Sequence, residues 1–412
     1  MGKSNALDGI EVLARLATGE DLADALDGRR REAGPVRGGS LGCAPHGSKA
    51  FTLGCTVQAG SATYSLSIEV QVNPELRIIH ERLKGPGPAL ESGIIEQRDL
   101  LWTRKPSPGA ASIDVEVFNG KRGTNPVLPF RDTRLLTSQL PLRILPRNEA
   151  DEAVIRGAQA VTAALRGAFH LDPIPHLMRD YVPERDNDLR RTGANISAAL
   201  SRLQKFDHPT FARIESLVQQ VGDERIQGLS VTRSELGDVM LALREQYNKR
   251  KKETTPAREM SDGLLRFVAI ATALLTSNQG LDIDPGPSEG GPHSGVLLLI
   301  EELENGLHPS QAGRVLELIK EVSADLATQV MLTTHSPALL NAMTGDLNRS
   351  VIVCYRDAAT GASRLTRLPD LAGYAEAMAS GRLGDVVSRG RMVQPELFDL
   401  EYDEFNRLLG IE

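Results

Sequence analysis

Two adjacent carboxylates follow the most apolar short run in the chain. Residues 296–300, "VLLLI", have the composition of a buried parallel strand, and Glu301 and Glu302 come directly after it. In open α/β sheets, ligands bind at this end of the strands. Glu301 can hold Mg²⁺ there, usually through its water shell, and Glu302 can orient or deprotonate a water that attacks a γ-phosphate. The simpler alternative is a strand that ends in solvated acids.

Two further segments carry residues that suit phosphate chemistry. The segment "TTHSP" places His335 after another apolar run, where an imidazole can contact a γ-phosphate. In "EMSDGLLRF", Ser261 and Gly263 precede a helix whose free N–H groups and partial positive charge attract an anion. Taken singly, a structural histidine and an ordinary helix cap are the commoner explanations.

The chain opens with "MGKSNALDGI", and Gly2-Lys3-Ser4 match the last three letters of the phosphate-binding loop G-x-x-x-x-G-K-[ST]. In such a loop, Gly2 allows close backbone approach, Lys3 pairs with the β- and γ-phosphates, and Ser4 can ligate magnesium. As a bare tripeptide, this match can arise by chance.

The composition of the chain limits which classes of protein can contain these candidate residues. The chain has 412 residues, 41% hydrophobic and 25% charged, which is ordinary for a soluble globular protein. A net charge of −7 gives no global basic field for nucleic acid. Cys43, Cys55 and Cys354 form neither a C-x-x-C pair nor an even set, which predicts a reducing cytoplasmic setting without structural zinc. The sequence has no apolar run of about 18 residues, so we expect no membrane span.

Apolar periodicity predicts the elements that position these residues. Strands of an antiparallel meander are expected at 51–58, 63–72, 76–83 and 112–118, and strands also at 226–233 and 238–246, the latter with a helical alternative. Helices are expected at the N-terminus, through most of 148–219, and at 261–277, 310–327 and 337–343. Short apolar strands at 296–300, 329–334 and 350–355 alternate with the last of these helices. That alternation predicts a parallel sheet with helices on its faces.

The order of the motifs resembles the AAA-type core of ABC-class ATPases related to the OLD (overcoming lysogenization defect) and SMC-like group. "GKSNALD" is similar to the family's phosphate loop and first helix, "RTGANISAAL" to its "DGxNL" segment, and "SDGLLRF" to its "SDGTLRF" signature. "IEELENGLHP" resembles its "IEEPENGLHP" Walker B and D-loop, and "TTHSP" is identical to its histidine loop. The resemblance covers nearly the whole chain.

The resemblance implies an α/β P-loop NTPase of the ABC-ATPase type: a parallel sheet with helices on its faces, an antiparallel β subdomain and a helical insertion. The expected divisions are the N-terminal part of the ATPase core at 1–147 and a mainly helical insertion at 148–255. The C-terminal part of the core would follow at 256–345, and a strand and helix extension at 346–412.

The resemblance also implies a role for each candidate residue. Glu301 would take the Walker B magnesium role, Glu302 that of the catalytic base, and His335 that of the γ-phosphate sensor. The nucleotide and its Mg²⁺ would be held by Gly2, Lys3, Ser4 and Asn5, with Ser4 as a metal ligand.

Two of the implied contacts lie elsewhere in the sequence. The signature residues Ser261, Asp262 and Gly263 would contact ATP held by a second subunit. Gln139 in "TSQLP" lies at the position of the family's glutamine loop. An ordinary polar loop residue is an equal alternative there.

These roles imply ATP and Mg²⁺ as ligands and a head-to-tail homodimer that forms around ATP. DNA or an effector protein is a possible further partner, and DNA repair or phage defence is the associated function. A transporter's nucleotide-binding subunit and a non-catalytic scaffold or truncated fragment are the alternatives. The run "NKRKK", ending at Lys252, is either a DNA contact or a solvated charge run.

OLD-type relatives carry a C-terminal TOPRIM nuclease, and the segment after His335 is short for such a domain and lacks an acidic cluster. Asp282 and Asp284 lie in a Gly/Pro-rich stretch and are expected to be solvated linker. Nuclease activity would then have to come from a partner.

Two departures from the family pattern affect the site. Leu303 stands where the family has proline, which the turn should tolerate. The front half of the phosphate loop and its strand are missing, so ATP binding by a chain that begins here should be weakened. We expect Met1 to be a valine codon, GTG, read as a start, with about 25–40 residues preceding it, roughly two strands and a turn. Translating the DNA upstream tests this, and an immediate in-frame stop would exclude it.

Overall fold

The computed structural model describes residues 2–28, 34–89, 95–107, 109–110, 112–121, 123–247, 251–283, 295–305, 312–325, 328–343, 345–357 and 360–388. The chain divides into two compact units that each combine distant parts of the sequence. Unit 1 comprises Met1–Ser4, Leu171–Asp282 and Leu298–Glu412, and unit 2 comprises Asn5–His170 and Ile283–Leu297.

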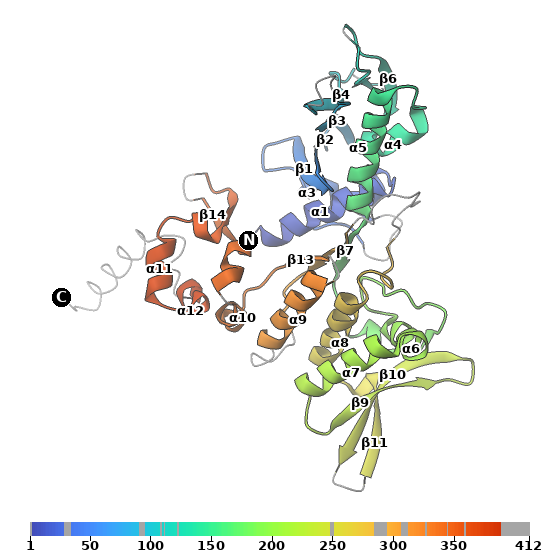
Figure 1. Ribbon diagram of the computed structural model, residues 1–412, viewed down its shortest axis with the longest axis vertical. Coiled ribbons are helices and arrows are strands. Elements are labelled where there is room, and N and C mark those ends of the chain that lie inside the picture. The colour runs from blue at the N-terminus through green and yellow to red at the C-terminus, as the bar shows by residue number, and fades with distance from the viewer. Residues whose placement is uncertain are drawn as a thin grey trace, which may run out of the picture. The chain divides into compact units, whose positions relative to one another are not determined.

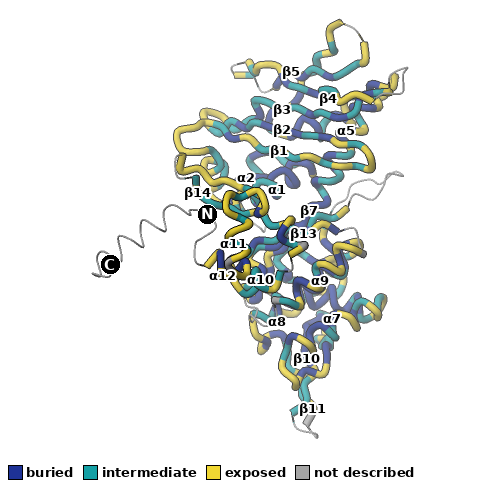
Figure 2. The backbone as a smooth tube through the Cα atoms, turned by 60° about the vertical axis from the view of Figure 1, so that its left-hand side comes forward, coloured by how far each residue is buried: buried dark blue, intermediate teal, exposed yellow. Residues whose placement is uncertain are grey.

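Unit 2 is built on a six-stranded antiparallel meander in the order β1-β2-β3-β4-β5-β6. Buried residues alternate with half-buried ones along β2 and β3 because successive side chains point to opposite faces of a sheet (Figure 2). The strands are β1 Ala50–Ala59, β2 Ala62–Gln71, β3 Arg77–Pro86, β4 Gln97–Thr103, β5 Ser112–Val117 and β6 Val127–Arg131. The expected meander is therefore confirmed, with β4 and β6 added to it.

The long helix α5, Glu149–Arg166, packs against one face of this sheet (Figure 1). It begins where the Asn148 side chain accepts hydrogen bonds from the N–H groups of Ala150 and Asp151. Gly157 allows the close approach to the sheet, because a Cβ there would lie 2.7 Å from the Leu100 side chain. The shared core also takes in residues from α1, α2 and α4.

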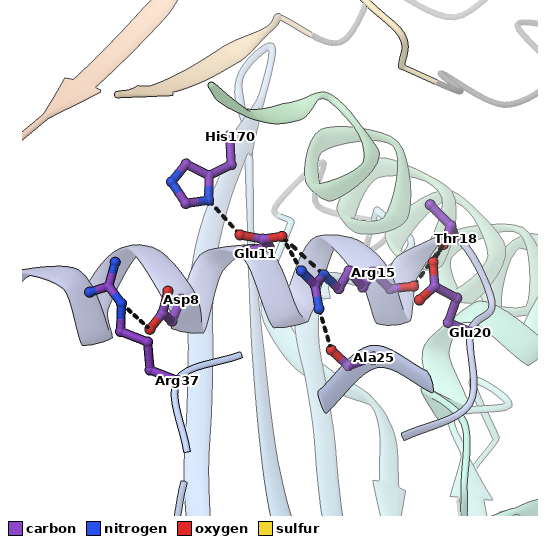
Figure 3. A network of polar contacts seen from close by, with 8 residues as sticks. All are labelled: Asp8, Glu11, Arg15, Thr18, Glu20, Ala25, Arg37 and His170. Carbon is purple, nitrogen blue, oxygen red and sulfur yellow. Dashed lines mark hydrogen bonds and ion pairs between the residues drawn. The ribbon is translucent and has the colours of Figure 1, made fainter. Parts of the chain in front are cut away.

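The first helix, α1 Lys3–Ala17, carries a buried polar network on its inner side (Figure 3). Glu11 and Arg15 form a buried ion pair, and Arg15 also donates to the carbonyl of Ala25, 2.7 Å away, in α2 Leu22–Asp27. The other oxygen of Glu11 contacts His170 Nδ1. A charge this deeply buried is tolerated only with its partner in place.

A second buried carboxylate, Glu81 of β3, caps helix α4, Leu136–Arg143, which lacks a cap from its own N-cap side chain. Its oxygens accept from the backbone N–H of Leu136 at 2.8 Å and from the hydroxyl of Thr137 at 2.6 Å. Burial raises the pKa of Glu81 to about 7, although these donors favour the ionised form.

This pKa shift predicts a pH dependence of stability. Because the folded-state pKa lies above the ordinary 4.5, the folded protein binds more protons between these values. Stability should therefore fall as pH rises from about 4.5 to 7. We expect Glu81→Gln to flatten this slope and Glu69→Gln, on the neighbouring strand, to leave it unchanged. Urea unfolding followed by the fluorescence of Trp102, the single tryptophan and a β4 residue, reports on unit 2. An unchanged slope in Glu81→Gln would contradict the assignment.

Unit 1 contains an antiparallel sheet in which β10 pairs with β8, β9 and β11. Its strands are β8 Val182–Pro183, β9 Ile226–Arg233, β10 Asp238–Tyr247 and β11 Lys251–Pro256, and its helices include α6 Ile196–Phe206 and α7 His208–Val221. The segment with a helical alternative is thus the strand β10.

The apolar segment that follows forms helix α8, Asp262–Leu275, which is buried almost throughout. The run "VLLLI" supplies β12, Leu297–Ile300, whose side chains from Leu298 on are also buried. β12 lies between β13, Gln329–Leu332, and β7, Ala168–Leu171, in a three-stranded sheet. β7 lies inside the stretch expected to be mainly helical.

The remaining elements of unit 1 are α9 Ala312–Asp325, α10 Pro337–Ala342, the hairpin of β14 Ile352–Arg356 and β15 Ser363–Arg367, α11 Tyr374–Ser380 and α12 Leu383–Ser388. The α/β class with a parallel sheet and separate antiparallel sheets is therefore confirmed. The strand expected at 350–355 does not belong to the parallel sheet, because β14 pairs antiparallel with β15 in a two-stranded sheet of its own. In the part of the chain that the structure describes, no helix is both long and apolar enough to cross a bilayer.

Candidate functional site

The carboxyl end of β12 is tied to the end of β13 by backbone contacts. Thr333 donates its N–H to the Ile300 carbonyl at 3.0 Å, and its hydroxyl accepts from Glu302 N at 3.0 Å. Leu303 donates its N–H to the Thr333 carbonyl at 3.2 Å, a bond that the family's proline could not make. Leu303 is also buried, so its side chain is part of the core at this strand end.

Glu302 has an unusual backbone conformation. Its φ is +42°, in the left-handed region that costs a non-glycine residue about 1–2 kcal/mol. The turn is held by Asn305, whose N–H donates to the Glu302 carbonyl at 2.8 Å and whose amide donates to Glu302 Oε2 at 2.6 Å. The exposed carboxylate of Glu302 is therefore aimed by its backbone and anchored at one oxygen.

Lys3 reaches the histidine loop from the opposite end of the sequence. Its ammonium donates to the carbonyl of Thr334 at 2.9 Å, across a separation of 331 residues. Burial lowers the pKa of Lys3, and the negative charges of Glu304 and Glu302 act in the opposite direction. The phosphate-loop lysine and the acidic strand end thus share one site within unit 1.

Gly2 lies against the β14–β15 hairpin. Its φ of +105° favours glycine, and a Cβ would lie 2.8 Å from Ser363 Cβ and 3.1 Å from Cys354 Sγ. Any side chain at position 2 would therefore displace the hairpin or the start of α1. Cys43, Cys55 and Cys354 all lie in the described part of the chain, and none of them forms a disulfide.

Ser4 and Asn5 lie in the first turn of α1, directly after Lys3. This turn carries no acidic residue, so the partial positive charge of its free N–H groups is not neutralised locally. Such a helix start suits an anion. No described contact assigns a ligand to either side chain, and both stay predicted ligands.

His335 and Ser336 line a cleft of about 480 Å³ together with Glu302, Glu304 and Asn305. The backbone N–H of His335 donates to Glu304 Oε1. Ser336 caps α10 by accepting from Leu339 N at 3.3 Å. The histidine loop is therefore fixed on one side by a helix cap and on the other by Glu304.

The signature residues occupy the start of α8 in unit 1. Ser261 is the N-cap and accepts from Leu264 N at 3.3 Å. The carboxylate of Asp262 accepts from Arg179 at 2.7 Å, and the same guanidinium donates to the Met260 carbonyl. The helix-cap explanation is thus correct for Ser261, and binding of a phosphate at this helix start stays a prediction.

Ser261 and Gly263 also line a separate cavity of about 600 Å³. The acidic residues Glu245, Glu253 and Glu259 also line this cavity. Neither signature residue lines the cleft beside His335. Within one chain, the signature and the Walker B end therefore face different cavities.

Gln139 lies in α4 of unit 2, where local backbone groups engage its amide. Nε2 donates to the Arg131 carbonyl at 2.9 Å, and Oε1 accepts from Arg131 N at 3.2 Å. These bonds connect α4 to the end of β6. A glutamine-loop role stays a prediction.

Asn195, in the "RTGANISAAL" segment, is buried and bonded in three directions. Its amide nitrogen donates to the carbonyls of Asp186 and Asp188 at 2.9 and 2.7 Å, and its oxygen accepts from Arg190 N at 2.9 Å. This residue therefore organises the loop that precedes α6.

The structure thus brings together Lys3, Glu302 and His335 and adds Glu304, Asn305 and Thr333. Glu304 stands two residues after Glu302 inside the Walker B motif, and this position in the motif could have identified it as a site residue from the sequence. Asp284 and the motif residues 306–310 lie outside the described residues, as does most of "NKRKK".

The donor set fits a magnesium nucleotide rather than a closed metal site. Among the described residues, no three histidine, cysteine, aspartate or glutamate side chains gather to hold a metal. Mg²⁺ in phosphate sites takes only one or two protein oxygens and completes its shell with water and phosphate. The half-buried lysine and the acid-free start of α1 supply the complementary positive charge for phosphate.

A phosphate-loop lysine that reaches the histidine loop, together with paired carboxylates at the end of a buried strand, is the arrangement of a P-loop ATPase. Residues 1–341 match the family described as "AAA domain, putative AbiEii toxin, Type IV TA system", and the chain belongs to that family. No curated protein matches the chain.

Several solved structures are similar at low identity. A Smc head bound to the C-winged helix domain of ScpA has 12% identity and a TM-score of 0.39, covering 89% of this chain and 86% of that one. A Pyrococcus furiosus Smc head bound to the C-terminal domain of ScpA has 11% identity and a TM-score of 0.37. The match covers 92% of this chain and 90% of that one. The Thermotoga maritima SMC head has 12% identity and a TM-score of 0.28. The match covers 75% of this chain and 74% of that one. At these scores the likeness assigns nothing further to this chain.

Proposed function

We propose that this protein binds ATP with Mg²⁺ and hydrolyses it, and that two copies associate head to tail around the nucleotide. The observation that carries the proposal is the contact of Lys3 with the Thr334 carbonyl beside Glu302, Glu304 and His335. A cation and a general-base candidate within one site are what γ-phosphate hydrolysis requires.

Each residue has a separate task in this proposal. Lys3 and the start of α1 would bind the phosphates, and Ser4 and Glu301 would hold the Mg²⁺, which neutralises charge on the transferred phosphoryl group. Glu302 would accept the proton of the attacking water, and His335 would contact the γ-phosphate.

The separation of the signature from the Walker B end supports the proposed homodimer. Ser261 and Gly263 line a cavity different from the one beside His335. We propose that the helix start of α8 completes the ATP site of a second copy, with Asp262 held back by Arg179.

The cellular role is part of the proposal. The family description names a toxin and a type IV TA system, which supports phage defence over DNA repair as the process. DNA or an effector protein would then be the partner that ATP turnover controls.

Replacing the phosphate-loop lysine tests the nucleotide site. Lys3→Ala should weaken equilibrium binding of Mg-ATP roughly 10-fold to 100-fold, because a hydrogen bond from a charged donor contributes about 1.5–3 kcal/mol. Lys105→Ala, an exposed lysine of unit 2, is the matched control and should bind like the parent chain. Equal affinity of the Lys3→Ala variant and the parent would refute the site.

A further inference from the structure

We infer that Glu304 is a positioning residue of the nucleotide site, with one carboxylate oxygen fixing the histidine loop and the negative charge of the group acting as the resting counter-charge of Lys3. This inference rests on the proposed function, because it assigns the cleft to phosphate. It assigns Glu304 a role that is separate from the proposed roles of Glu301 and Glu302.

The first observation concerns the histidine loop. The backbone N–H of His335 donates to Glu304 Oε1, so the carboxylate holds the main chain at the residue that should sense the γ-phosphate. The other end of this short segment is fixed by the Thr334 hydroxyl, which accepts from Ser336 N at 3.0 Å. Without Glu304, the N–H of His335 would lose its acceptor.

The second observation concerns the free oxygen. Glu304 Oε2 is buried and accepts no hydrogen bond among the described residues. A buried carboxylate oxygen without a donor is costly unless a positive charge lies nearby. The charge available is that of Lys3, whose ammonium donates to the carbonyl of Thr334, the residue before the His335 that Glu304 holds.

The third observation concerns the cleft. Glu304, Glu302 and His335 line the same space of about 480 Å³, and the Lys3 ammonium ends on the carbonyl of the residue before His335. An arriving phosphate would therefore take Lys3 from the Thr334 carbonyl and meet the negative charge of Glu304. The carboxylate thus opposes phosphate binding while it keeps His335 in place.

Two variants separate these functions. Glu304→Gln keeps an oxygen for the His335 N–H and removes the negative charge, whereas Glu304→Ala removes both. Glu317→Gln and Glu317→Ala, at an exposed position of α9 in the same unit, are the matched controls.

The first readout needs no nucleotide. Amide hydrogen exchange at His335 in the free protein should be about 3- to 10-fold faster in Glu304→Ala than in the parent, as expected for one lost hydrogen bond. In Glu304→Gln it should stay close to the parent. Equal exchange in all three proteins would overturn the positioning role even if the protein does not bind ATP.

The second readout separates affinity from turnover. Both Glu304 variants should bind Mg-ATP and inorganic phosphate several-fold more tightly than the parent, because the opposing charge is gone. Only Glu304→Ala should lose most of its kcat. Unchanged or weaker phosphate binding by Glu304→Gln would overturn the counter-charge role. Absence of Mg-ATP binding by the parent would instead refute the proposed function.

Discussion

Replacing Glu302 by glutamine should lower ATP turnover about 10²- to 10⁴-fold while leaving the Kd for Mg-ATP within a few-fold of the parent value. General-base catalysis contributes a rate factor of this size. The amide keeps the shape of the carboxylate and an oxygen for its surroundings but cannot accept a proton. Binding should persist because the proposed phosphate contacts come from Lys3 and the start of α1.

The local structure supports this assignment of the base. Glu302 adopts its left-handed φ at the end of a buried strand, and backbone strain of this kind clusters at functional sites. Asn305 holds Oε2, which leaves Oε1 directed by the turn and available to a water. Glu302 and His335 also line the same cleft.

Single-turnover measurement beside equilibrium binding checks the prediction. Glu317→Gln, an exposed acid of α9, is the control and should retain parental turnover. If hydrolysis is arrested after binding, the Glu302→Gln variant should also accumulate ATP-dependent dimers in size-exclusion chromatography. Turnover near that of the parent would remove Glu302 from the mechanism, whereas a parallel loss of binding would make it a ligand.

The second large effect concerns stability. Glu11→Ala should reduce the free energy of unfolding of unit 2 by about 3–5 kcal/mol, because it leaves the buried guanidinium of Arg15 without its counter-ion. His170 would lose its contact with Glu11 at the same time (Figure 3).

Urea unfolding monitored by Trp102 fluorescence measures this loss in unit 2. Glu152→Ala on α5 is the control, since its pair with Arg156 is exposed and should contribute about 0.5 kcal/mol or less. The double variant Glu11→Met/Arg15→Met should recover much of the stability because no charge stays buried alone. A loss in Glu11→Ala no larger than in Glu152→Ala would contradict the assigned role of the pair.

Local patterns in the sequence were sufficient to predict several helices and strands. The alternation in β2 and β3 and the apolar run of β12 predicted strands because each depends only on which face its own side chains present. The same holds for α8, whose serine cap also follows from local sequence. Strand β7 was missed because it has four residues and directly follows the periodic pattern of α5.

For the candidate site, too, some features follow from local sequence and others only from the tertiary structure. Residue type and spacing by themselves identified the paired carboxylates, the histidine, the signature and the phosphate-loop lysine as candidate site residues, since each is a short contiguous motif. Only the tertiary structure decided that Lys3 ends on the Thr334 carbonyl and that Glu304 holds the His335 N–H. These contacts join segments far apart in the chain, and a local pattern holds no information about which distant backbone group a side chain will meet.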